Sequence, residues 1–190
     1  MKGAGLSVIC LEDVGAHDDF LCRSAKAYKG ELRVTSVSDM VSKALAAAGS
    51  QLIRRLYILG HGASGDQSVG SGRDFDATGD RCLALRNDAF KLRGDAESHL
   101  LRLKGKLSQD AVITLGGCYV AEGEKGKALL MRISGLLDDV NVDASESLQK
   151  PWPGTEGIVI RCTGQVWGVV YEGHEYTRED TKEVTPAWHG

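Results

Sequence analysis

Two short apolar runs, each closed by glycine and a reactive side chain, decide the fold that this sequence predicts. They are Leu56-Tyr57-Ile58-Leu59, followed by Gly60-His61-Gly62, and Ala111-Val112-Ile113-Thr114-Leu115, followed by Gly116-Gly117-Cys118. Short apolar runs bounded by glycine are typical of buried strands. If the two strands are parallel neighbours, their carboxyl ends meet at one edge of the sheet, where open α/β folds place their sites. We therefore expect His61 and Cys118 to lie close together.

The segments around the first run alternate between strand-like and helix-like patterns. In chain order they predict a strand at 6–11, a helix at 18–29, a strand at 31–37, a helix at 38–48 with Ser38 as its N-cap, and a strand at 53–59. This order of strand, helix, strand, helix, strand indicates a parallel sheet covered by helices.

The rest of the chain continues this pattern after one interruption. Residues 62–80 hold five glycines and four aspartates and are expected to form a long loop, with a short hairpin around Ser71 as an alternative. Beyond it we expect a helix at 95–107, a strand at 111–115, a helix at 126–137, a strand at 141–144, a loop at 145–155, and a hairpin of strands 157–162 and 166–171.

The expected fold class is therefore α/β: a three-layer α/β/α sandwich with a mainly parallel sheet, extended at one edge by the C-terminal β-hairpin. Residues 1–173 are expected to form a single domain, and residues 174–190 a charged tail.

Length, composition and charge indicate a globular protein and argue against several other classes of protein. A length of 190 residues suits one domain with a substantial core, and 42% hydrophobic and 26% charged residues are typical of a globular chain. A net charge of −3 gives no reason to expect nucleic acid or an anionic membrane as a partner. No apolar run approaches the roughly 20 residues that span a bilayer, and the apolar stretch near the N-terminus is too short for a secretory signal. We expect a cytoplasmic protein, or one delivered from the cytoplasm as an effector.

The cysteines and histidines are scattered in a way that argues against a metal site. No two cysteines have the C-x-x-C spacing, and no histidines have H-E-x-x-H spacing, so we expect neither a metal nor another cofactor. Cys10 and Cys162 lie in strand-like runs and are expected to be small core residues. Cys22 falls on an expected helix. Cys82 follows the glycine-rich loop, and its surroundings in the sequence favour neither burial nor exposure of its side chain. Cys118 follows two glycines at a strand end, so its side chain is the one expected to be accessible.

A thiol beside an imidazole is the minimal equipment for nucleophilic catalysis by cysteine.

Two other interpretations of the stretch around His61 fail. The run from Gly60 to Gly65 fits G-x-G-x-x-G, but a dinucleotide fingerprint needs a helix directly behind it, and here the glycine- and aspartate-rich stretch follows. A serine nucleophile elbow fails because Asp66 stands where its last glycine belongs.

The blocks around Cys118 also carry a resemblance to a known family. They are Ile113-Thr114-Leu115-Gly116-Gly117-Cys118-Tyr119-Val120-Ala121-Glu122-Gly123, then Gly126-Lys127-Ala128-Leu129-Leu130, then Val142-Asp143-Ala144-Ser145. Together with His61-Gly62-Ala63-Ser64-Gly65, they resemble the bacterial caspase-like domain known as DUF4347 over about residues 50 to 172. Through it the chain resembles the clan CD cysteine peptidases, the group of caspases, gingipains, clostripain and separase. The QAC-type sequence of true caspases is absent, because Gly116 stands where the glutamine would be, so the resemblance gives no support to a caspase-like preference for aspartate.

The resemblance implies a caspase-hemoglobinase-like fold and roles for particular residues. Cys118 would be the nucleophile, His61 the general acid/base, and the backbone amides of Gly62 and Cys118 the oxyanion hole. The implied activity is that of a cysteine endopeptidase that cuts a protein or peptide substrate through a thioester acyl-enzyme, without a cofactor.

Candidate substrate-binding residues come from the other expected strand ends. Glu12, Asp13, Gly116, Asp143 and Ser145 are expected to face the same crevice as His61 and Cys118. An acidic pocket there would favour a basic residue at the cleaved bond, while the alternative is that these acids are ordinary surface residues.

Two other functions remain open. One is a caspase-like binding or assembly module that is catalytically silent, and the other is a cysteine-dependent acyltransferase or amidase acting on a non-peptide substrate. The reactivity of the Cys118 thiol separates a silent module from either enzyme.

Overall fold

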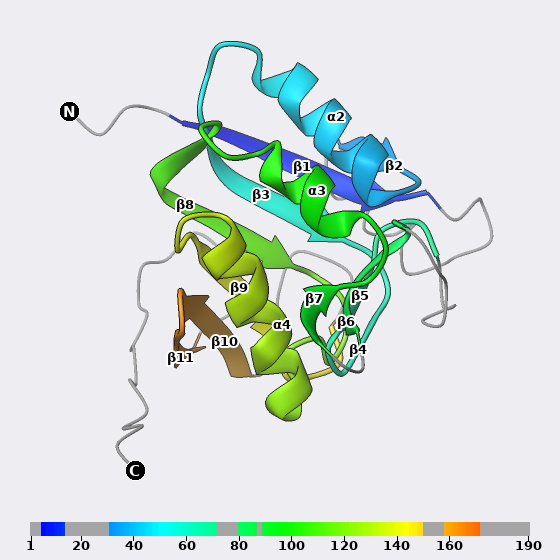
Figure 1. Cartoon of the computed structure of the whole chain (residues 1–190), viewed down its shortest axis with the longest axis vertical. Helices are drawn as coiled ribbons and strands as arrows, with labels where there is room; N and C mark the ends of the chain where they lie inside the picture. The colour runs from blue at the N-terminus through cyan, green and yellow to red at the C-terminus, as the bar shows by residue number, and fades with distance from the viewer. Residues whose placement is uncertain (1–4, 14–30, 72–79, 87–88, 150–157, 172–190) are drawn as a thin grey trace.

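The computed structural model describes residues 5–13, 31–71, 80–86, 89–149 and 158–171. Within them, seven strands form one large sheet in the order β11-β10-β9-β8-β3-β1-β2 (Figure 1). These strands are β1 (Leu6–Glu12), β2 (Leu32–Val34), β3 (Ile53–Leu59), β8 (Leu107–Leu115), β9 (Asn141–Ser145), β10 (Ile158–Thr163) and β11 (Val166–Tyr171).

The sheet is mainly parallel. Strand β1 pairs in parallel with β2 and β3, β3 with β8, and β8 with β9, while the hairpin β10–β11 joins β9 in antiparallel fashion. The two apolar runs that decided the expected fold are therefore neighbouring parallel strands, as predicted. The expected C-terminal hairpin also extends one edge of the sheet.

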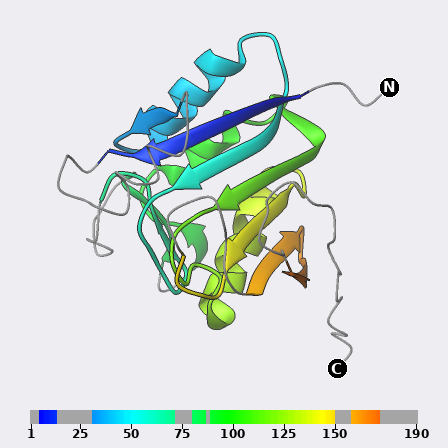
Figure 2. The same ribbon diagram turned by 180° about the vertical axis from the view of Figure 1, so that it is seen from behind.

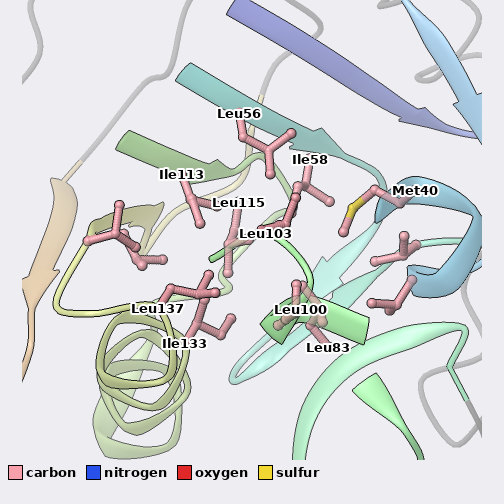
Figure 3. Packing of buried hydrophobic residues seen from close by; sticks show 14 of the residues in the cluster. Met40, Leu56, Ile58, Leu83, Leu100, Leu103, Ile113, Leu115, Ile133 and Leu137 are labelled. Atoms are coloured by element: carbon pink, nitrogen blue, oxygen red, sulfur yellow. The ribbon is translucent and has the colours of Figure 1, made fainter. Parts of the chain in front are cut away.

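Among the described residues, three helices pack on the large sheet: α2 (Val37–Ala48), α3 (Ala96–Leu101) and α4 (Gly123–Leu136). In Figure 1 they lie in front of the sheet, and in Figure 2, seen from behind, the sheet lies in front of them. Apolar side chains from β3 and β8 point toward these helices and form the core (Figure 3). The core side chains labelled there are Met40, Leu56, Ile58, Leu83, Leu100, Leu103, Ile113, Leu115, Ile133 and Leu137.

The alternation of β3 explains how the strand is fixed between water and core. Ile53, Leu56 and Ile58 are fully or almost fully buried, while the intervening Arg55 is exposed. A shift of one residue in register would expose the apolar set, so burial holds the register of β3 against its neighbours. That register sets where the chain after β3 emerges from the sheet.

The expected α/β class with a large, mainly parallel sheet and packed helices is confirmed. The helix expected at 18–29 and the charged tail at 174–190 lie outside the described residues. No helix within the described ranges combines the length and the apolar character needed to cross a lipid bilayer.

A second, antiparallel sheet was not predicted. It has the order β4-β5-β6-β7, with β4 (Gly62–Ala63), β5 (Asp66–Ser68), β6 (Cys82–Arg86) and β7 (Ala89–Leu92), and it lies beside the carboxyl ends of β1, β3 and β8 (Figures 1 and 2). The expectation of a continuous loop from residue 62 is therefore wrong for residues 62–68. The hairpin in this stretch forms between β4 and β5, ahead of Ser71.

Several element boundaries also differ from the expected ones. Helix α2 begins at Val37 and its N-cap is Ser36, whose Oγ accepts a hydrogen bond from the Asp39 amide at 3.1 Å, so Ser38 lies inside the helix and the strand before it is short. Helix α3 ends at Leu101 rather than 107, because the chain turns through Gly105 at a φ of +75° into β8. Helix α4 starts three residues before the expected position, and β9 extends to Ser145.

Candidate active site

The two strand ends that carry His61 and Cys118 are adjacent. Ile58 of β3 pairs with Leu115 of β8. His61 lies three residues after Ile58, and Cys118 lies three residues after Leu115. The following backbones touch. A methyl group on Gly117 would lie 2.7 Å from the Gly62 Cα and 2.8 Å from the His61 carbonyl oxygen, closer than real side-chain atoms approach. The glycines therefore allow the two segments to pack against each other.

The His61 segment is held from one side by Glu12, at the end of β1. The Glu12 side chain is fully buried. One carboxylate oxygen accepts from the His61 amide at 3.1 Å, and the other accepts from the Gly70 amide at 2.7 Å and from the Ser68 hydroxyl. Hydrogen bonds to an ionised acceptor are stronger than neutral ones, so this buried carboxylate ties β1 to both ends of the His61–Gly70 excursion.

Gln67, in β5, holds the same segment from the other side and connects it to the Cys118 loop. The side chain is fully buried. Its amide oxygen accepts from the Gly117 N–H at 2.8 Å, and its amide nitrogen donates to the Ser68 carbonyl at 2.8 Å and, less closely, to the His61 carbonyl at 3.4 Å. A single side chain therefore contacts the backbone immediately before Cys118 and the backbone of His61.

The hairpin β4–β5 is also joined to the chain that follows Cys118. The Gly65 amide donates to the Val120 carbonyl at 3.0 Å, and the Ser64 hydroxyl donates to the Glu122 carbonyl at 2.7 Å. The buried Asp66 carboxylate forms an ion pair with Lys125 of α4 at 2.7 Å. The hairpin β4–β5 thus holds the chain around Cys118 in place through hydrogen bonds and an ion pair.

Cys118 lies in a turn between β8 and α4 and is half-buried. Its sulfur accepts a hydrogen bond from the Gln149 amide at 3.3 Å. The next residue, Tyr119, has a φ of +58°, an uncommon backbone conformation for a residue with a side chain, and its amide donates to the Ser147 carbonyl at 3.0 Å. The Cys118 N–H itself donates to no other residue that the structure describes.

The other described cysteines are closed to solvent. Cys10, Cys82 and Cys162 have exposed fractions of 0%. Burial, with a smaller effect of the Asp39 charge, raises the pKa of the Cys10 thiol to about 12. Burial, with a smaller effect of the Asp143 charge, raises the pKa of the Cys162 thiol to about 12 as well. A thiol that stays protonated is a poor nucleophile, so both are core residues, as expected.

The expected acidic pocket is corrected at two of its residues. Glu12 is sealed inside and uses its carboxylate to hold backbone and hydroxyl groups, as described above. Asp143 is 5% exposed, and Arg161 of β10 binds its two oxygens at 2.7 and 2.8 Å. Their charges serve the fold, because a buried carboxylate needs hydrogen-bond donors or a cation beside it.

The remaining substrate-binding candidates lie at the same edge in different settings. Asp13 is exposed. The Gly116 amide donates to the Ile58 carbonyl at 2.8 Å, which continues the ladder between β8 and β3. Ser145 is 2% exposed, and its hydroxyl accepts from the Ser147 amide at 3.0 Å, so it shapes the segment that runs beside Cys118. Contact of these residues with a substrate stays a prediction, as does an oxyanion hole at Gly62 and Cys118.

Sequence reasoning missed two residues that hydrogen-bond to the Cys118 loop, Gln67 through its side chain and Gln149 through its backbone amide. Gln67 lies in a stretch expected to be a loop, and nothing in its local pattern indicates burial. In the part of the chain that the structure describes, no three histidine, cysteine, aspartate or glutamate side chains gather closely enough to hold a metal ion.

Comparison with known proteins identifies a family but no activity. Residues 31–149 match the family described as Domain of unknown function (DUF4347). No curated protein and no solved structure matches the chain. The matched range covers more than half of the 190 residues and includes both His61 and Cys118. The chain therefore belongs to the DUF4347 family.

Proposed function

We propose that this protein is a cysteine endopeptidase that uses Cys118 as its nucleophile and His61 as its general acid/base. The single observation that carries the proposal is the packing of the Gly62 backbone against the Gly117 backbone, next to the one half-buried thiol of the described cysteines. This packing supports a thiol and an imidazole that share one solvent-accessible edge of the sheet. An adjacent base activates a thiol for nucleophilic acyl transfer.

The chemistry follows from these two groups and the nearby amides. The imidazole takes the thiol proton, and the sulfur attacks the substrate carbonyl, whose oxygen gains the negative charge. The Cys118 N–H, which donates to no other described residue, would stabilise that oxygen together with the Gly62 N–H. The C–N bond then breaks as the imidazolium gives its proton to the leaving amine, which leaves a thioester. Water, deprotonated by the imidazole, hydrolyses the thioester and restores the thiol.

We also propose a caspase-like relationship for the family. It is supported by the placement of His61 after β3 and of Cys118 after β8, on adjacent parallel strands, with Cys118 leading into a helix. A protein or peptide substrate follows from this relationship. Nucleic acid and membrane partners do not fit the modest net charge of −3.

Substitution of the nucleophile tests the proposal. Cys118→Ala and His61→Ala should each lower cleavage of a broad peptide library to background, because each removes a group that takes part in bond breaking, and Cys118→Ala should also abolish labelling by thiol-reactive peptide electrophiles. His99→Ala is the matched control, since His99 lies on α3 and pairs with Asp80 at 3.5 Å. If Cys118→Ala still cleaves the library and is still labelled at the wild-type level, Cys118 is not the nucleophile.

One observation favours a second candidate, the catalytically silent binding module. The Gln149 amide already occupies the Cys118 sulfur, and Gln149 is 6% exposed, so the segment Ser147–Gln149 covers one side of the thiol. Slow and uniform alkylation of all cysteines by iodoacetamide would support this module. A fast-reacting Cys118 without any peptide cleavage would instead point to an acyltransferase or amidase.

A further inference from the structure

The Gln67 side chain hydrogen-bonds to the backbones of both reactive segments. It is fully buried, and all of its partners are backbone groups: the Gly117 N–H at 2.8 Å, the Ser68 carbonyl at 2.8 Å and the His61 carbonyl at 3.4 Å. Its oxygen faces a donor and its nitrogen faces acceptors, so these partners fix the orientation of the amide. Neither strand β3 nor β8 needs this link for its own ladder.

We infer that Gln67 is a positioning residue for the pair of His61 and Cys118, an inference that rests on the proposed function. Its amide sets the distance between the turn that carries the thiol and the segment that carries the imidazole. Glu12 completes the arrangement by accepting from the His61 N–H at 3.1 Å. The His61 peptide is therefore held at its N–H by β1 and at its carbonyl by β5, where the Ser68 amide also donates at 2.9 Å.

The link has a second consequence for the site. Because the Gly117 N–H is committed to Gln67, it does not face a substrate, and the next amide along the chain, that of Cys118, is the one without an acceptor among the described residues. Loss of the Gln67 oxygen frees the Gly117 N–H and lets the turn rotate, which moves both the sulfur and the Cys118 N–H. A misplacement of about 1 Å in a reacting group is enough to lower a rate by about 100-fold.

The test compares two variants of Gln67 with a control that loses a similar buried link elsewhere. Gln67→Met keeps the length and shape of the side chain but removes the donor and the acceptor. Gln67→Glu keeps an acceptor for the Gly117 N–H, but it offers a donor to the Ser68 and His61 carbonyls only when it is protonated. The control is Ser134→Ala, because the buried Ser134 hydroxyl donates to the Val140 carbonyl and accepts from the Gly164 amide, both at 2.6 Å, at the other end of α4.

Two rates are measured in the full-length protein: alkylation of Cys118 by iodoacetamide, followed by peptide mapping, and cleavage of the best library peptide, resolved into kcat and KM. Gln67→Met should lower both kcat and the Cys118 alkylation rate at least about tenfold with KM little changed, since positioning acts on the reacting groups. Ser134→Ala should leave these rates as in the wild type, even where it lowers stability. Relative to the wild type, Gln67→Glu should recover as the pH falls from about 7.5 to about 5, where its carboxyl can carry a proton.

The outcomes separate this inference from the proposed function. A reactive wild type together with a folded Gln67→Met whose kcat and alkylation rate stay within twofold of it would overturn the positioning role alone. A wild-type Cys118 no more reactive than a free thiol, with no peptide cleaved, would overturn the proposed function and the inference with it. If Gln67→Met does not fold, the pH recovery of Gln67→Glu decides, and a flat ratio to the wild type rejects the inference.

Discussion

At the scale of single residues, the buried carboxylate of Glu12 accepts hydrogen bonds from three groups around the candidate site. It is fully buried, and its two oxygens accept from the His61 amide, the Gly70 amide and the Ser68 hydroxyl. An ionised carboxylate is a stable occupant of the interior only with such donors around it. Its position at the end of β1 therefore serves to hold the chain that leaves β3.

Glu12→Gln should destabilise the protein although it preserves size and shape. An amide turns one acceptor oxygen into an NH₂ group that faces the His61 amide, or the Gly70 amide and the Ser68 hydroxyl, so at least one buried donor loses its partner. We expect a loss of about 1–3 kcal/mol in the free energy of unfolding, measured by urea titration. Asp13→Asn, at the exposed neighbouring position, should change it by less than about 0.5 kcal/mol. Equal and small effects of the two substitutions would contradict this role of Glu12.

Tyr119 shows that the turn carrying the thiol is under local backbone strain. Its φ of +58° is uncommon for a residue with a side chain, and the hydrogen bond from its amide to the Ser147 carbonyl holds it in place. Strained residues of this kind concentrate at functional sites when the surroundings fix them. The strain falls on the residue next to Cys118, which fits a turn shaped to present that side chain.

At the scale of the elements, the start of α2 depends on a reciprocal cap. The Ser36 hydroxyl accepts from the Asp39 amide at 3.1 Å, and the Asp39 carboxylate accepts from the Thr35 amide at 3.1 Å. Burial opposes ionisation of Asp39, but hydrogen bonds from Lys43 and from the Thr35 amide outweigh it and hold the pKa of Asp39 below its ordinary value. The helix therefore begins at a fixed point, which also fixes the Asp80 carbonyl as acceptor for the Val37 amide.

Ser36→Ala should cost more stability than Ser38→Ala. The first substitution removes the cap oxygen and leaves an orphan amide at the helix start, which typically costs about 1 kcal/mol. The second removes a hydroxyl inside the first turn, which caps no backbone group. Thermal or urea unfolding of the two variants checks the order. A larger loss for Ser38→Ala would restore the helix start expected from the sequence.

The ion pair between β9 and β10 should be worth more than one at the surface. Arg161 binds both oxygens of Asp143, a carboxylate whose side chain is 6% exposed. Arg161→Leu leaves that buried charge without its cation and should cost about 3 kcal/mol of unfolding free energy. Arg54→Leu breaks a pair with Asp110 in which the side chains are 39% and 56% exposed, and it should cost much less because water screens that pair. Similar losses in the two variants would contradict the distinction.

The elements that the sequence predicted well are those with an apolar period. Strands β1, β3 and β8 bury apolar side chains in the large sheet, and these residues alone indicate the strands. Strand β5 has the opposite character. Its three residues Asp66, Gln67 and Ser68 are all polar and all buried, so hydrophobic periodicity carries no signal there.

The length of α3 was overestimated for a related reason. Leu100 and Leu103 are spaced as on a helix face, and both are buried. Leu103 reaches the core from a turn, however, with the Lys106 amide bonded to its carbonyl at 2.9 Å, and β8 starts at Leu107. Burial in a turn has the same pattern as burial on a helix, so the end of the helix depends on the tertiary packing.

At the scale of the whole molecule, the position of the candidate site was predictable but its support was not. Parallel neighbouring strands place their carboxyl ends together, so the meeting of the His61 and Cys118 segments follows from the order of the elements. The links through Glu12 and Gln67 join residues about 50 positions apart in the chain. No local pattern encodes such pairs, because each polar side chain is buried only after its distant partner is in place.

Alkaline pH should destabilise the whole fold through its buried thiols. Burial raises the pKa of Cys10 and of Cys162 from 9.0 to about 12, with smaller contributions from Asp39 and Asp143. Between these values the unfolded chain releases protons that the folded protein keeps, so the free energy of unfolding falls as the pH rises from about 9. Each thiol contributes a slope of up to about 1.4 kcal/mol per pH unit.

Unfolding titrations at several pH values check this prediction. The double variant Cys10→Ala/Cys162→Ala should show a shallower decline above about pH 9 than the wild type, even where its stability at neutral pH is lower. Ser36→Ala is the control and should keep the wild-type slope, because it removes a helix cap and leaves both buried thiols in place. Parallel declines in the wild type and the double variant would show that other groups govern the alkaline limb.

The central claim is that the Cys118 thiol reacts with the help of the His61 imidazole. The most direct test measures how fast iodoacetamide alkylates Cys118 near pH 7, in the wild type and in His61→Ala. The account predicts that wild-type Cys118 reacts at least about tenfold faster than a free cysteine and that His61→Ala removes this advantage, with Cys10, Cys82 and Cys162 unmodified in both folded proteins. An alkylation rate of Cys118 that is the same with and without the imidazole would contradict it.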